Sequence, residues 1–225
     1  PMIFTEYTFW IFFLLVLSGY SLIYNKIRLR SIFLLLVSLY FYFKTSGFFF
    51  SILLFSTVLD FFLGKAIYNS KKELNAKVLL VLSIASNLLI LIYFKYAYFF
   101  ADSFNSIIGS NWQPINHFAL LTNQATGSSF RVDQILLPVG ISFYTFQTMS
   151  YYIDIFRKKL TPVNNIFDFG FYVSFFPQLV AGPIVRASEF IPQIQQPYTL
   201  SKKDFGTALF WILNGLLKKF LLADY

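Results

Sequence analysis

Long apolar runs recur along this chain and are separated by shorter polar or basic segments. The runs cover about residues 7–24, 31–43, 47–63, 78–100 and 135–156. A helix needs about 20 apolar residues to cross the roughly 30 Å hydrocarbon core of a bilayer, because each residue rises 1.5 Å. The runs therefore predict membrane-spanning helices, of which the second is short for a full crossing.

A further apolar segment, residues 166–185, is interrupted by Gly170, Pro177, Gly182 and Pro183. In lipid every backbone N–H and C=O must find a partner inside the protein, so a broken helix persists only where it is buried or lines a watery cavity. Both flanks of this segment can be basic and cytosolic. We therefore expect a re-entrant or half-membrane hairpin. The fold class is all-α, a polytopic bundle of transmembrane helices that contains this broken-helix segment.

The remaining segments complete a single membrane domain over residues 1–225. Residues 101–134 form the long polar segment, which we expect outside the membrane, either functional or partly folded onto the membrane surface. Residues 186–204 are polar and expected in the cytosol. The last run, residues 205–223, carries two lysines near its end, so it either crosses against the usual charge bias or lies partly at the interface.

Composition and charge support a membrane protein. The chain is 57% hydrophobic and only 12% charged, about half the charge of a soluble domain. Its net charge of +8 follows topology rather than nucleic-acid binding, because ten basic residues follow the first, third and fifth runs while the segments between them hold only Lys44 and Arg131. These ten are Lys26, Arg28, Arg30, Lys65, Lys71, Lys72, Lys77, Arg157, Lys158 and Lys159. The positive-inside rule then places the N-terminus outside.

Polar side chains share one face of the fifth run. Tyr144, Gln147 and Tyr151 follow i, i+3, i+7 spacing. A polar stripe inside a membrane faces protein or water rather than lipid. It is equally compatible with a substrate path and with hydrogen bonding between helices.

The Pro/Gly break is the sharpest motif of the chain. Gln178, Gly182, Pro183 and Arg186 lie in PQLVAGPIVR, where proline and glycine free backbone groups and the arginine supplies a permanent charge. Such groups can face a substrate. The alternative is a structural kink with the arginine paired to lipid phosphate, which residue chemistry alone favours because proline and glycine are common in membrane helices.

Titratable residues give no catalytic assignment within the chain. Asp60 and Asp154 lie near the ends of runs, where we expect interfacial pairing. His117, the only histidine, lies in the outer segment without an adjacent acid and is expected to be a surface or loop residue rather than a general base. Cysteine is absent, and we expect no metal site and no bound cofactor.

Two blocks carry a resemblance to a known family. LPVGISFYTFQTMSYYIDIFR and YVSFFPQLVAGPIVR resemble the membrane-bound O-acyltransferases, and especially their alginate O-acetyltransferase branch; MIFTEYTFW and FKYAYFF are similar to that branch as well. The resemblance implies a many-helix bundle in the inner (plasma) membrane, with a tunnel through a thinned centre. It implies transfer of an acyl group, expected to be acetyl, from a thioester donor such as acetyl-CoA to hydroxyls of an extracytoplasmic polysaccharide.

The same resemblance bears on site residues and partners. The family's histidine is expected beyond Tyr225, His117 does not match it, and the chain is expected to be an N-terminal portion that is inactive alone. Expected partners are membrane lipid, the polysaccharide acceptor and an extracytoplasmic acetylation protein, with no nucleic acid. A transporter built on broken helices and a non-catalytic scaffold subunit are the alternatives. We expect six residues to border the substrate path as supports: Tyr144, Gln147, Gln178, Gly182, Pro183 and Arg186.

Overall fold

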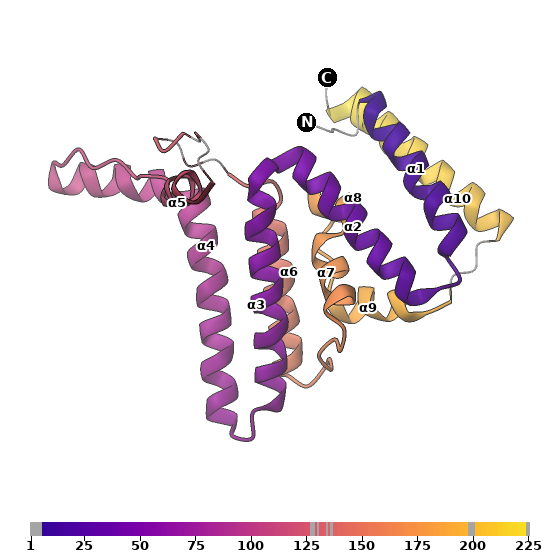
Figure 1. Cartoon of the computed structure of the whole chain (residues 1–225), viewed down its shortest axis with the longest axis horizontal. Helices are drawn as coiled ribbons and strands as arrows, with labels where there is room; N and C mark the ends of the chain where they lie inside the picture. Colours follow the sequence, from indigo (N-terminus) through magenta and orange to yellow (C-terminus); the bar gives the residue numbers. More distant parts are fainter. Residues whose placement is uncertain are drawn as a thin grey trace. The chain divides into compact units, whose positions relative to one another are not determined.

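The computed structural model describes residues 6–126, 129, 131–133, 135, 137–197 and 201–223, and within these ranges it contains helices and connecting segments but no strand (Figure 1). The predicted all-α class is therefore confirmed. Helices α1 to α9 belong to one compact unit and α10 to a second. The elements are α1 (Tyr7–Ile23), α2 (Ile27–Ser46), a 3-10 turn (Gly47–Phe49), α3 (Phe50–Asn69), α4 (Glu73–Ile108), α5 (His117–Thr126), α6 (Ile141–Phe156), α7 (Ile166–Ser174), α8 (Phe176–Ala181), α9 (Ala187–Gln195), α10 (Lys202–Lys218) and a π-helical turn (Lys219–Ala223).

Helix α6 lies at the centre of the first unit. It packs against α3, α4, α7 and α9, while α2 packs along α7 (Figure 1). The fully buried side chains at these contacts include Leu53, Tyr152 and Phe169. A small residue permits the closest approach, because a methyl group at Gly64 of α3 would lie 2.7 Å from the ring of Tyr151 of α6. Small residues at helix contacts are typical of membrane bundles.

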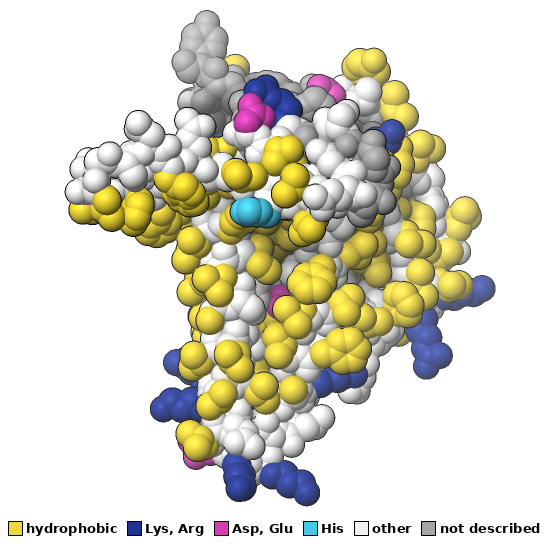
Figure 2. Space-filling model, turned by 60° about the vertical axis from the view of Figure 1, so that its left-hand side comes forward, with side chains coloured by type: hydrophobic (Ala, Val, Ile, Leu, Met, Phe, Trp, Pro, Cys, Tyr) yellow, Lys and Arg dark blue, Asp and Glu magenta, His cyan; other side chains and the backbone are white. Residues whose placement is uncertain are grey.

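The outer faces of the first unit are apolar, as a lipid environment requires. Two helical segments, Ile27–Asn69 (α2, the 3-10 turn and α3) and Glu73–Ile108 (α4), are long and apolar enough to cross a bilayer, and only 39% and 22% of their most apolar windows are buried. Phe62 and Leu89, for example, are exposed. Figure 2 shows apolar side chains over the face of the bundle and Lys and Arg gathered at its lower end. The chain is therefore a membrane protein with a polytopic helical fold.

Two helices extend beyond the apolar runs that predicted them. Helix α3 continues to Asn69, and α4 has 36 residues, or about 54 Å at 1.5 Å per residue, which exceeds the thickness of a bilayer core. The last turns of α4 run sideways from the bundle in Figure 1. Phe104 and Ile107 are exposed there, and the projecting arm in Figure 2 is apolar on its lower side and polar above. Part of the segment 101–134 therefore folds into helix, in α5 and this arm.

The first half of residues 186–204, the segment expected to be polar and cytosolic, forms a helix that packs on the bundle. Helix α9 buries Ala187, Ile191 and Ile194, one face of an amphipathic helix, against α6 and α7. The buried guanidinium of Arg30 in α2 donates to the carbonyl of Ile194. Arg30 is one of the ten basic residues counted for the topology, and it is buried against α9.

One outer basic residue is paired. The Arg131 guanidinium lies 2.8 Å from the Asp133 carboxylate, and this hydrogen bond holds the pKa of Asp133 below its usual value. The pairing leaves Arg131 in the charge count, because the positive-inside rule counts Lys and Arg and is not a net-charge rule.

Candidate functional site

The predicted broken helix is confirmed, and its position follows from Pro177. Helix α7 ends at Ser174 and α8 begins at Phe176, with Phe175 in an extended conformation at φ −51° and ψ 110°. In a continuous helix the ring of Pro177 would clash with the carbonyl of Val173, which would also lose its N–H partner. A break at Phe175 instead puts Pro177 in the first turn of α8, where the missing N–H costs least.

Side chains of two other helices satisfy two of the backbone groups that the break releases. In a continuous helix the carbonyl of Tyr172 would accept from the N–H of Phe176. Here the Gln147 amide of α6 donates to the Tyr172 carbonyl at 2.7 Å, and the Phe176 N–H donates to the Ser38 hydroxyl of α2 at 3.3 Å. All four residues are buried. The break is therefore a built feature, fixed from both sides of α7.

Tyr172 also holds the segment that follows α8. Its hydroxyl lies 3.3 Å from the backbone carbonyl of Gln147 and 3.2 Å from that of Val185, and can donate to either. Between these points the Gly182 N–H donates to the Gln178 carbonyl at 2.9 Å, and a methyl group at Gly182 would lie 2.5 Å from the Gln178 Cα. Only glycine therefore fits the turn that ends α8.

Polar groups without protein partners occur in α6 and in α8. Within the described parts of the chain, the Tyr144 and Thr145 hydroxyls and both amide atoms of Gln178 are buried and make no hydrogen bond. Gly140, one turn before Tyr144, contacts Leu179, the neighbour of Gln178. Buried polar groups are paired in the great majority of cases. The Ser31 and Ser46 hydroxyls and one Asp60 carboxylate oxygen, elsewhere in the first unit, also lack a hydrogen bond within the described chain.

The six predicted path residues fall into two groups. Tyr144, Gln147 and Gln178 are buried, whereas Pro183 and Arg186 are exposed and Gly182 is half-buried between them. The backbone carbonyl of Arg186 accepts from the first turn of α9, and its guanidinium forms no ion pair with any residue that the structure describes. A role of the six along a substrate path stays a prediction.

The structure contains a buried polar network between α3, α4 and α6 that the sequence analysis did not predict. One carboxylate oxygen of Asp60 accepts from the Asn87 amide at 3.0 Å and from the Tyr152 hydroxyl, and Thr148 donates to the Asn87 carbonyl oxygen at 3.4 Å. Asp60 is 1% exposed, so the expected interfacial pairing is wrong. Asp154 is buried as well. The sequence did contain one indication of this network, namely Asn87, a lone amide within the apolar run 78–100.

Comparison with known proteins gives relatives along almost the whole chain. It is 34% identical to a probable alginate O-acetylase of Pseudomonas aeruginosa and 33% identical to one of Azotobacter vinelandii, each over 99% of the chain. A peptidoglycan O-acetyltransferase of Helicobacter pylori is 30% identical over 85% of the chain. The chain belongs to the membrane-bound O-acyltransferase family. It spans about two fifths of the length of these relatives, namely 40%, 42% and 38%.

Two further comparisons are negative. No family model matches the chain, and no solved structure matches it. The family assignment therefore rests on the curated relatives, which are named as O-acetylases or O-acetyltransferases.

The single histidine of the chain lies away from the break. His117 begins α5 and is exposed, and its backbone N–H donates to the Tyr93 hydroxyl at 2.8 Å. It borders an apolar hollow of about 360 Å³ that Trp112 and Pro114 also line, and Figure 2 shows it among hydrophobic side chains. The position agrees with the expected surface histidine. In the part of the chain that is described, no group of His, Asp and Glu could hold a metal ion.

Proposed function

We propose that the whole protein transfers an acetyl group from a thioester donor, acetyl-CoA, to hydroxyls of an extracytoplasmic polysaccharide. The observation that carries this proposal is the similarity along 99% of the chain to proteins named alginate O-acetylase. The peptidoglycan O-acetyltransferase similarity shares O-acetyl transfer and differs in the acceptor that its name states. Both groups of relatives therefore support acetyl transfer, whereas the choice of acceptor polysaccharide rests on the alginate O-acetylases alone.

The reaction has a simple balance. The acceptor hydroxyl attacks the thioester carbonyl, a C–O bond forms, the C–S bond breaks, and the hydroxyl proton passes through a general base to the departing thiolate. Such a base works best when its pKa lies near the working pH, which is the unperturbed range of histidine. Because His117 is exposed and outside the break region, we propose that the base is a histidine outside these 225 residues.

The contribution of this chain is positioning. Gln147 and Ser38 fix the break, which leaves Tyr144 and Gln178 with polar groups free for a substrate or for the helices of the rest of the protein. Holding donor and acceptor in a reactive geometry is a large part of catalysis. In the proposed arrangement the protein lies in the inner membrane with its N-terminus outside, and an extracytoplasmic partner protein and membrane lipid take part.

An acetyl-transfer assay tests the function. Membranes that contain the whole protein are mixed with radiolabelled acetyl-CoA and with alginate or peptidoglycan, and label in the polysaccharide is measured. We expect base-labile label in at least one polysaccharide. Uptake or export of the polysaccharide without label would favour a transporter instead, and no effect of the protein on either would favour a scaffold subunit.

Replacing Gln147 with leucine in the whole protein is expected to lower the transfer rate by roughly tenfold, which corresponds to about 1.4 kcal/mol of lost positioning. The change leaves the Tyr172 carbonyl at the break without its donor. Membrane insertion should persist, because leucine inserts more readily than an amide. Gln193→Leu is the matched control, since that amide is exposed and bonds only within α9. Normal transfer by Gln147→Leu would assign Gln147 to packing alone.

A further inference from the structure

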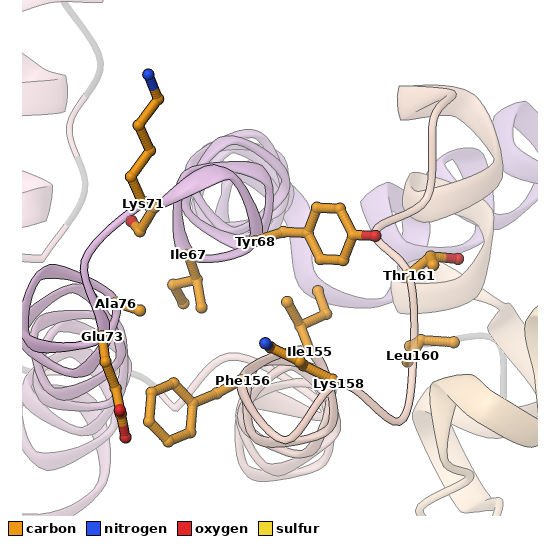
Figure 3. A pocket seen from close by; sticks show the side chains of 11 residues that line it. Ile67, Tyr68, Lys71, Glu73, Ala76, Ile155, Phe156, Lys158, Leu160 and Thr161 are labelled. Atoms are coloured by element: carbon orange, nitrogen blue, oxygen red, sulfur yellow. The ribbon is translucent and has the colours of Figure 1, made fainter.

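A pocket of about 730 Å³ opens where α3 passes into α4 and where α6 ends (Figure 3). Its inner wall is apolar, because Ile67 and Ile155 are 3% and 1% exposed and Phe156 lies beside them. Its rim is polar and carries Lys71 and Lys158. The volume falls in the range of ligand pockets, roughly 300–1,000 Å³. The pocket lies entirely within the first unit and apart from the α7–α8 break.

Lys158 occupies a backbone position that usually belongs to glycine. Its φ is +57°, the only positive φ of a non-glycine residue in the described ranges. Two hydrogen bonds define the turn that closes α6, from Lys158 N–H to the Ile155 carbonyl at 2.9 Å and from Lys159 N–H to the Asp154 carbonyl at 2.9 Å. This is the Schellman motif, whose left-handed residue is glycine in most helices because a Cβ is strained there. A lysine at this position costs stability.

The strained position directs the lysine side chain toward the pocket. In Figure 3 the Lys158 ammonium projects into the middle of the labelled side chains, between Ile67 and Phe156. Within the described chain it forms no ion pair. Glu73 also lines the pocket, and its side chain is exposed, as are those of Lys71 and Lys158. In Figure 3 the Glu73 carboxylate points away from the Lys158 ammonium. Strained residues that persist cluster at ligand sites.

We propose that this pocket binds the phosphate group of an amphiphilic ligand. Lys158 would hold the phosphate, while the wall of Ile67, Ile155 and Phe156 would take an apolar part. The Lys71 ammonium points away from that of Lys158 in Figure 3, so Lys71 contributes charge at the rim and no contact. An ammonium suits a phosphate as a point charge with three donors. The phosphate can come from the headgroup of an anionic phospholipid or from a soluble phosphate compound. The proposal does not depend on acyl transfer.

A diffuse basic surface also attracts anionic lipid, so the experiment separates the pocket from the surface. The whole protein is purified in detergent, and binding is measured with phosphatidylglycerol, with phosphatidylcholine and with inorganic phosphate or adenosine 3′,5′-bisphosphate. Lys158→Gln is compared with Lys159→Gln, which removes the same charge one residue further along. Lys159 is exposed and does not line the pocket.

We expect Lys158→Gln to weaken binding about tenfold and Lys159→Gln to change it less than about twofold, since one direct charge contact to phosphate is lost in the first variant only. Preference for phosphatidylglycerol over phosphatidylcholine identifies a lipid headgroup, and competition by the soluble phosphates identifies a soluble ligand. Equal weakening by the two variants would contradict binding in the pocket. Binding that is no stronger for phosphatidylglycerol or the soluble phosphates than for phosphatidylcholine would contradict recognition of phosphate.

A second variant keeps the test independent of folding defects. Lys158→Gly relieves the left-handed strain, so the melting temperature should rise while phosphate binding falls as in Lys158→Gln. A variant that is both more stable and unable to bind identifies the lysine as a ligand-holding residue. Retained binding in Lys158→Gly would contradict the proposal.

Discussion

Replacing Asp60 with leucine is expected to lower the free energy of unfolding by about 3–5 kcal/mol. The carboxylate accepts hydrogen bonds from Asn87 of α4 and Tyr152 of α6, and all three residues are buried. Its loss leaves two buried donors without their acceptor, and each unpaired buried group costs about 1–3 kcal/mol. Thermal or denaturant unfolding of the detergent-solubilised protein measures the change.

Two variants define what the Asp60 experiment shows. Asp60→Asn keeps the shape and one acceptor oxygen, so we expect a loss below about 1.5 kcal/mol. Asp102→Leu makes the same chemical change as Asp60→Leu at an exposed position of α4, and surface changes of this kind stay within about 0.5 kcal/mol. An Asp60→Leu variant as stable as Asp102→Leu would show that the network contributes nothing to stability.

Replacing Gly140 with alanine is expected to destabilise the protein by about 2–4 kcal/mol. Gly140 precedes α6 with φ +72°, and a methyl group there would lie 2.6 Å from the Leu179 carbonyl oxygen of α8. The left-handed conformation costs a non-glycine residue about 1–2 kcal/mol. Overpacking against α8 costs about 1–3 kcal/mol more.

Gly109 gives a matched control for the Gly140 experiment. It has φ +71° at the end of α4, and a methyl group there would meet no atom within 4 Å. Gly109→Ala therefore measures the conformational cost alone, and the difference between the two variants isolates the contact between α6 and α8. Equal losses of stability in Gly140→Ala and Gly109→Ala would show that α8 moves aside with no loss of free energy, and that the break is not held tightly.

Much of the fold follows from apolar runs and helix breakers. The first run matches α1, the run at 47–63 covers the 3-10 turn and most of α3, and the run at 78–100 lies within α4, because length and apolarity are local properties. The break of 166–185 follows from the geometry of Pro177, which excludes a continuous helix whatever surrounds it. Apolarity does not show where helices end, so α4 extends eight residues past its run to Ile108.

The candidate site depends on contacts that no local pattern contains. Asp60 finds its partners 27 and 92 residues away, so a position near the end of an apolar run gave the wrong environment. Gln147 and Ser38 meet the break from 25 and 138 residues away in the chain. Helix α9 is short, and its buried face appears only once α6 and α7 lie beside it.

The O-acetyl content of the extracytoplasmic polysaccharide tests the central claim most directly. It is measured in cells that lack the gene, in cells that carry the whole protein again and in cells that carry its Gln147→Leu variant. We expect acetylation to be lost on deletion, restored by the whole protein and reduced by the variant at equal membrane abundance. Acetyl content that stays the same when the gene is deleted would contradict the account.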